Sequence, residues 1–252
     1  MTRSLWSFVA LLPLGAAALA AQTSRVAAWG SYEGVTASAD WSTAGAQLTL
    51  SSARGHAAWA GAELLSRFGA NDATERIGGV LHPAPRWWFT VEAGTALQPA
   101  FMPKNTWEAD VTALVAARGS FGLAYRRWNY VAGPVDMVIP HFSLQTRTVA
   151  WDLRVSLSQN PSQRTDAAFY VRATKPLTRR IVGWVLGGAG RESYMVGTAP
   201  AAQVRSLDTV TGSAGLRCSV GNGFTLRLDA SVINSRPVLS RRGVGVGLER
   251  QF

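Results

Sequence analysis

The sequence contains one cysteine, Cys218, and only two lysines among its 25 basic residues. A single cysteine has no partner in the chain, so no internal disulfide can hold the fold together. Long apolar runs are also missing after the N-terminal region. The best stretch, residues 181–190, has ten uncharged residues with arginines on both sides, whereas a membrane-spanning helix needs about 20 apolar residues. These absences exclude a disulfide scaffold and a helical membrane domain.

Catalytic and metal-binding motifs are equally scarce. There is no Gly-x-Ser-x-Gly, no His-Glu-x-x-His and no spaced cluster of histidine and cysteine, the patterns that serve hydrolases and zinc sites. Of the three histidines, His56 and His82 are predicted in tight turns and His141 within a strand. The grouping Arg191-Glu192-Ser193, with Asp72 or Asp110 nearby, is ordinary for a polar rim. We therefore predict no catalytic residue, no metal site and no cofactor.

The N-terminus has the pattern of a secretory signal peptide. Arg3 precedes an apolar run from Leu5 to Leu14, and small residues follow up to Ala21. A positive start, a short apolar core and a small-x-small ending are typical of a cleaved signal. We predict a signal peptide at 1–20 and a single domain at 21–252.

The C-terminal ten residues indicate what that domain is. Val244, Val246, Leu248 and Phe252 fall on one face of an extended strand, and glycines with Glu249 and Gln251 fall on the other. Residues 107–115, 149–157 and 224–232 alternate in the same way. A transmembrane barrel strand requires this alternation, because one face meets lipid and the other a wet lumen. A strand of a soluble sheet can show it too.

Strand length and number favour the barrel. We predict an all-β fold, a single antiparallel up-and-down transmembrane β-barrel of about fourteen strands, with twelve as the fallback. The predicted strands are 25–34, 41–52, 57–68, 73–82, 86–96, 105–116, 119–130, 135–144, 148–158, 165–175, 180–191, 206–217, 223–234 and 242–252. The connections 97–104, 159–164 and 192–205 are longer than the turns at the opposite end, as in bacterial outer-membrane barrels.

The polar face of these strands predicts a charged lumen. The candidate luminal residues are Glu108, Asp110, Asp152, Arg154, Arg172, Arg227 and Asp229. Nine tryptophans follow residue 20, several near predicted strand ends, where interfacial girdles use such rings. The net charge of +10 comes from arginines spread along strands and turns, which does not favour nucleic acid.

The predicted loop 192–205 and its flanks are the candidate lid or partner surface. Its polar candidates are Arg191, Glu192, Tyr194 and Arg205. Because guanidinium groups bind phosphate in a bidentate manner, we expect outer arginines to contact outer-membrane lipid, including lipopolysaccharide. The terminal strand ending in Phe252 is the expected contact for the barrel-assembly machinery.

Several short motifs, each weak alone, follow one another along the chain. They are Tyr32-Glu33, Asp40-Trp41, Arg67-Phe68-Gly69 with Asp72, Pro85-Arg86-Trp87, Tyr125-Arg126-Arg127-Trp128, Gly188-Ala189-Gly190-Arg191-Glu192 and Arg241-Arg242-Gly243-Val244. In this order, and with the terminal aromatic, the chain resembles the YaiO-type outer-membrane β-barrel proteins of Gram-negative bacteria from about Tyr32 to Phe252. The resemblance implies a barrel at the cell surface and, for some members, an association with surface-polysaccharide export. It supplies no catalytic residues. Longer relatives carry helical repeats before the barrel, and we expect none here.

The sequence therefore leaves more than one class of function possible. We expect a porin-like barrel of the bacterial outer membrane that binds or passes a saccharide, such as an exported polysaccharide, or a small polar solute. The alternatives are a barrel enzyme acting on lipid or peptide at the outer rim and a purely structural barrel.

Overall fold

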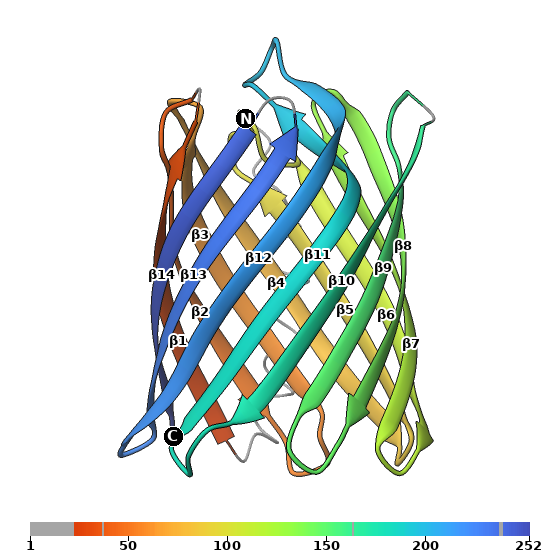
Figure 1. Ribbon diagram of the computed structural model, residues 1–252, viewed down its shortest axis with the longest axis vertical. Helices are drawn as coiled ribbons and strands as arrows, with labels where there is room; N and C mark the ends of the chain where they lie inside the picture. Colours follow the sequence, from red (N-terminus) through yellow and green to blue (C-terminus); the bar gives the residue numbers. More distant parts are fainter. Residues whose placement is uncertain (1–22, 37, 163, 237–238) are drawn as a thin grey trace, which may run out of the picture.

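The chain forms a closed antiparallel barrel in which each strand pairs with its neighbours in sequence and β1 pairs with β14 (Figure 1). The computed structural model describes residues 23–36, 38–162, 164–236 and 239–252. The predicted signal peptide lies outside these ranges. The described residues form fourteen strands and no helix. No helix long and apolar enough to cross a membrane is found among them. The predicted fold and strand number are confirmed.

The fourteen strands lie close to their predicted positions. They are β1 (Thr23–Val35), β2 (Trp41–Ser51), β3 (Ala57–Arg67), β4 (Ala70–Ala84), β5 (Trp87–Ala96), β6 (Asn105–Ala116), β7 (Gly119–Tyr130), β8 (Gly133–Gln145), β9 (Ala150–Gln159), β10 (Thr165–Pro176), β11 (Ile181–Val196), β12 (Gln203–Gly221), β13 (Phe224–Arg236) and β14 (Leu239–Gln251). β8 forms despite Pro140: its pairing with β9 is recorded up to Val138 and resumes at His141, since proline has no backbone N–H for the ladder.

The prediction of a loop at 192–205 is wrong. β11 and β12 stay paired from Arg191 with Asp208 up to Val196 with Gln203, which leaves only residues 197–202 as the connection. The polar residues of this segment led to the wrong assignment. A hairpin that extends above the rest of the barrel wall no longer faces lipid, so its strands do not need an apolar face. This hairpin rises above the other connections in Figure 1. β12 also runs on to Gly221, through the turn that was predicted to begin at Cys218.

The two ends of the barrel differ. At one end β1 begins and β14 ends, and Phe252 N donates to Ser24 O at 2.9 Å. We call this the terminal end; it is the lower end in Figure 1. The opposite end, the loop end, carries connections 97–104, 160–164 and 197–202. The contrast in length is smaller than predicted, because the loop end also has two-residue turns such as 68–69.

Contacts between strands that are not neighbours identify the inner face. Trp59 Nε1 on β3 donates to Glu92 Oε2 on β5 at 2.9 Å, and Arg217 on β12 lies 2.8 Å from Glu249 on β14. Such side chains can meet only across the concave face of a closed barrel. Residues in register across a ladder share a face, so these contacts fix the inner face of every strand. The opposite face is apolar, and Val185 and Val244 are among its exposed side chains.

Aromatic rings fill much of the inner wall by lying over glycines of the next strand. A Cβ at Gly45 would come within 2.6 Å of the Trp29 ring, and one at Gly78 within 2.5 Å of the Trp59 ring. Only a residue without a side chain lets a ring lie this close to the backbone. The expected tryptophan girdle is therefore mostly wrong. Trp87, Trp107 and Trp151 lie on the outer face at 46%, 42% and 39% exposure, whereas Trp29, Trp41, Trp59, Trp88, Trp128 and Trp184 face inward.

The loop end is packed. Ala124, Val135, Met137 and Ile139 form a buried cluster on the inner face of β7 and β8, and Val204 of the β11–β12 hairpin packs against it. The hairpin therefore leans over the mouth of the barrel. Ala199 N in its tip donates to Ala100 O of the 97–104 connection at 2.8 Å. Two connections from different parts of the barrel thus meet across its mouth.

Candidate functional site

A cavity of about 340 Å³ opens inside the barrel beneath the packed mouth. It lies along the inner faces of β7 to β11. Its lining combines arginines, carboxylates, hydroxyls and rings: Arg126, Trp128, Val135, Met137, Ile139, Asp152, Arg154, Ser156, Ser158, Tyr170, Arg172, Leu186, Glu192, Ser193 and Tyr194. Sites for small molecules have about 300–1,000 Å³ and few polar groups that fix orientation. This cavity is of that size.

Three of the predicted luminal residues meet in this cavity. Register places Arg172 opposite Asp152 and Tyr170 opposite Arg154. Ser143 Oγ donates to Asp152 Oδ1 at 2.6 Å, and the Arg172 guanidinium lies 4.7 Å from the centre of the Trp184 ring. Within the part of the chain that the structure describes, neither Arg154 nor Arg172 donates a hydrogen bond to a carboxylate, so both arginines keep free N–H donors toward the cavity.

Glu108 borders the same cavity through its partner. Arg126 Nε lies 2.5 Å from Glu108 Oε2, and Arg126 itself lines the cavity. Asp110, two residues further along β6, accepts from Thr112 Oγ1 at 2.7 Å and contacts His141 Nε2 at 2.7 Å. The Arg126–Glu108 ion pair neutralises both charges on this part of the barrel wall.

Arg227 and Asp229 lie on the inner face of β13 but do not line the cavity. Arg227 Nε donates to Asp229 Oδ1 at 2.9 Å. The structure therefore places Asp152, Arg154 and Arg172 at the cavity, Glu108 and Asp110 on the neighbouring strand β6, and the Arg227–Asp229 pair elsewhere on the inner wall.

The four candidates from the predicted loop 192–205 and its flanks lie on the β11–β12 hairpin. Arg191 donates to both carboxylate oxygens of Asp208, at 2.8 and 3.2 Å, and Tyr194 donates to Glu192. Arg205 donates to Gln203 Oε1 at 3.1 Å. Each of these polar groups thus has a partner on its own hairpin.

The grouping considered for catalysis does not converge. Ser193 Oγ donates to Asp166 Oδ2 at 2.7 Å, and Asp72 accepts three backbone N–H groups from residues 100–102. Ser206 Oγ donates to the same Asp166 oxygen, and no histidine among the described residues is hydrogen-bonded to Ser193. The Ser193–Asp166 contact therefore lacks the histidine base that activates a serine nucleophile in acyl transfer. Among the described residues there is no group of three or more His, Cys, Asp or Glu side chains able to hold a metal ion.

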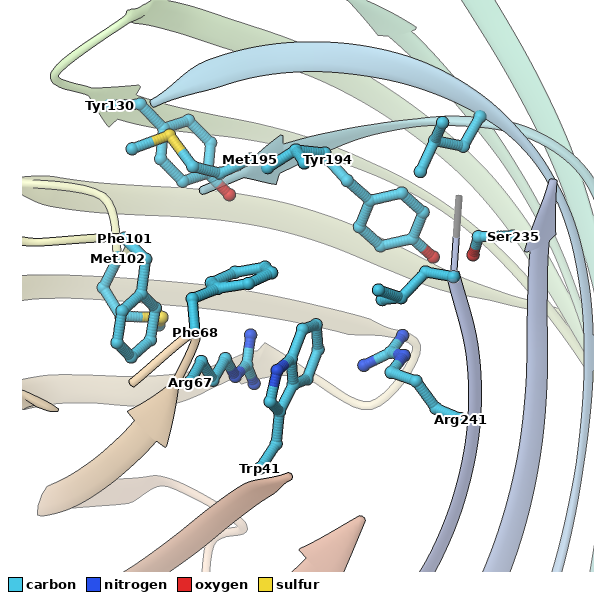
Figure 2. A pocket seen from close by; sticks show the side chains of 13 residues that line it. Trp41, Arg67, Phe68, Phe101, Met102, Tyr130, Tyr194, Met195, Ser235 and Arg241 are labelled. Carbon is cyan, nitrogen blue, oxygen red and sulfur yellow. The ribbon is translucent and has the colours of Figure 1, made fainter. Parts of the chain in front are cut away.

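A second pocket at the loop end was not predicted as a site. Trp41, Arg67, Phe68, Phe101 and Arg241 contribute to its lining (Figure 2). The short motifs around Asp40-Trp41, Arg67-Phe68-Gly69 and Arg241 were noted in the sequence, but their spacing along the chain gave no sign that they meet. Their strands, β2, β3 and β14, come together here through barrel closure.

Known proteins resemble this chain in fold. No protein-family model matches the sequence, and no curated protein matches it. Among solved structures, a bacterial polysaccharide outer membrane secretin superimposes with a TM-score of 0.61 at 7% identity, covering 91% of this chain and 98% of that one. Omp33 of Acinetobacter baumannii gives 0.57 at 9% identity over 91% and 99%, and a loop-deletion mutant of OmpT of Vibrio cholerae gives 0.52 at 10% over 92% and 100%. The chain therefore has the fold of outer-membrane β-barrels, and its resemblance to the YaiO-type proteins stays a prediction.

Proposed function

We propose that this chain is a bacterial outer-membrane barrel that binds and passes a polar solute, with saccharides as the favoured class. The observation that carries the proposal is the cavity lined by β7 to β11. There Arg154 and Arg172 lie beside Tyr170 and Trp128 and donate no hydrogen bond to any described residue. Saccharides present hydroxyl acceptors and apolar ring faces. Guanidinium donors and aromatic rings are suited to those two features.

Two further observations support a membrane location. The outer face of the barrel is apolar, as contact with lipid requires, and the similar structures named above are outer-membrane proteins. We infer that the loop end faces the outside. A polysaccharide partner is consistent with the first of those structures, whose name describes a polysaccharide secretin.

Lipid and the assembly machinery are the proposed macromolecular partners. Arg205 is exposed at the loop end, where lipopolysaccharide phosphates would lie, whereas Arg191 is already held by Asp208. Phe252 lies at the terminal end against β1, where the barrel closes, and is the proposed contact for assembly.

Single-channel conductance of the refolded protein in a planar bilayer tests the proposal. We expect steady openings that added oligosaccharide reduces, because the sugar occupies the cavity. Reversing Arg154→Glu should shift ion selectivity toward cations, and Asp152→Arg should shift it toward anions. Arg127→Glu is the matched control: Arg127 lies on the outer face, where it pairs with Asp136 at 3.4 Å, and its reversal should leave selectivity unchanged. A folded barrel that stays silent and unaffected by sugar would contradict the proposal.

A further inference from the structure

The pocket at the loop end contains a guanidinium group without a polar partner. Arg67, at the end of β3, has a buried Nε and donates no hydrogen bond within the described residues. Two aromatic rings lie close to it: the guanidinium carbon is 4.8 Å from the Trp41 centroid and 5.8 Å from that of Phe101. Cations buried in proteins are normally paired and hydrogen-bonded, because an unpaired one is costly to desolvate. Arg67 departs from that rule.

A second arginine approaches the same tryptophan. The Arg241 guanidinium carbon lies 4.6 Å from the Trp41 centroid, and its side chain is only 10% exposed. Figure 2 shows the Trp41 ring between the guanidinium groups of Arg67 and Arg241. Arg241 Nη1 reaches Glu33 Oε2 at 3.2 Å, while its buried Nε has no hydrogen-bond partner among the residues that the structure describes. Glu33 and Glu63 lie near Arg67, and Glu192 lies near Arg241. Among the described residues, none of these three carboxylates accepts a hydrogen bond from Arg67.

Trp41 adds a third unpartnered donor. The residue is 7% exposed, and its Nε1 is buried without a hydrogen-bond acceptor in the described part of the chain. A buried tryptophan N–H usually finds a partner. Thus Trp41 on β2, Arg67 on β3 and Arg241 on β14 each bring a buried N–H donor to one pocket, and none of these donors has an acceptor among the described residues.

The size of the pocket limits what that acceptor can be. Its volume is about 70 Å³, room for a few waters or for a group of several atoms, and too little for a whole sugar ring. The connection 97–104 closes one side, since Phe101 is 3% exposed and lines the pocket. Asp72 fixes this connection by accepting from Ala100 N at 2.7 Å and Met102 N at 2.6 Å. The wall of the pocket formed by the connection 97–104 is therefore held in place by hydrogen bonds.

We propose that this pocket binds an oxyanion group, a carboxylate or a phosphate, with Arg67, Arg241 and the Trp41 N–H as its donors. Guanidinium groups bind such groups through paired, charge-assisted hydrogen bonds. The group comes either as a free small anion or as the charged end of a saccharide. Anion binding at this pocket does not require conduction, because a barrel that passes no solute would still bind the anion at its mouth.

Calorimetric titration of the refolded barrel in nonionic detergent, at constant ionic strength, tests this site. The ligands are inorganic phosphate, glucuronate and glucose. We expect saturable binding of phosphate or glucuronate and none of glucose. Arg67→Gln should weaken the binding by about tenfold or more, given the strength of charge-assisted contacts. Arg205→Gln removes an equal charge from the same end without touching the pocket and should bind as the unaltered protein does.

Thermal unfolding of the same proteins without ligand separates binding from a structural role. If Arg67 exists for a ligand, Arg67→Gln unfolds at the same temperature as the unaltered barrel or higher, because a buried unpaired charge is gone. Binding of glucuronate alone assigns the group to a saccharide; binding of both anions supports a free oxyanion as well. Equal binding of glucose, no anion binding at all, or full anion binding by Arg67→Gln would overturn the proposal.

Discussion

The loop end and the rest of the inner wall are filled by different means. At the loop end, Trp41, Phe101, Val135 and Leu207 are nearly or fully buried, and the connection 97–104 closes the pocket beside them. Along the wall, charged side chains stay partly exposed and pair with one another, as Arg217 and Glu249 do at 2.8 Å. The mouth therefore has the character of a small protein core. The wall has that of a hydrated surface, where exchanging one charge has little effect on stability.

Removing the anchor of the mouth should have the largest effect. Asp72, 3% exposed, accepts backbone N–H groups of Ala100, Phe101 and Met102. Asp72→Ala leaves these donors without their acceptor, and we expect the free energy of unfolding to fall by about 2–4 kcal/mol. Conductance should rise, because the connection 97–104 is released. Denaturant unfolding in detergent and bilayer recordings measure the two effects.

Asp229→Ala is the matched change on the wall. Asp229 is 28% exposed and pairs with Arg227, so we expect a loss below about 1 kcal/mol. Equal losses for the two variants would remove the distinction between mouth and wall.

The wall is tightly packed where rings lie over glycines. A Cβ at Gly188 would come within 2.4 Å of the Tyr170 ring, whereas one at the adjacent Gly187 would meet nothing within 4 Å. Gly188→Val should therefore destabilise the barrel by about 1–3 kcal/mol through overpacking. Gly187→Val, on the outer face, should have little effect in the same unfolding measurement. Comparable stability of the two variants would show that Tyr170 moves aside freely.

These contrasts show what the sequence could and could not predict. Strand positions and luminal residues such as Asp152 and Arg154 follow from alternation with period two, which is local and which the barrel enforces on each strand. The inward tryptophans could not be predicted in this way, because Trp29 depends on Gly45 in the neighbouring strand. Likewise, the pocket around Arg67 is lined by residues from β2, β3, β14 and the connection 97–104. These segments come together only when the barrel closes.

A paired charge on the wall should affect permeation more than stability. Glu249 lies 3.4 Å from Arg25 and 2.8 Å from Arg217. Glu249→Gln leaves two luminal arginines without their carboxylate, so we expect stronger preference for anions and a stability change below about 1 kcal/mol. Glu75→Gln, an exposed carboxylate on the outer face of β4, removes the same charge. If it changes selectivity equally, the lumen does not control the choice of ion.

The smallest effect is expected at the rim, outside both regions. The Tyr32 phenol and the Val35 backbone N–H donate to the Asp40 carboxylate and hold its pKa below the usual range. A carboxyl with a lowered pKa in the folded state stabilises the fold above its unfolded pKa, and this contribution is lost as the pH falls through the folded pKa. Tyr32→Phe removes the first of the two donors, so the pKa of Asp40 should rise toward its ordinary value in an NMR titration. Because Asp40 is exposed, the thermal unfolding temperature should hardly change between pH 7 and mildly acidic pH. An unchanged pKa in Tyr32→Phe would show that the backbone N–H of Val35 alone holds the carboxylate.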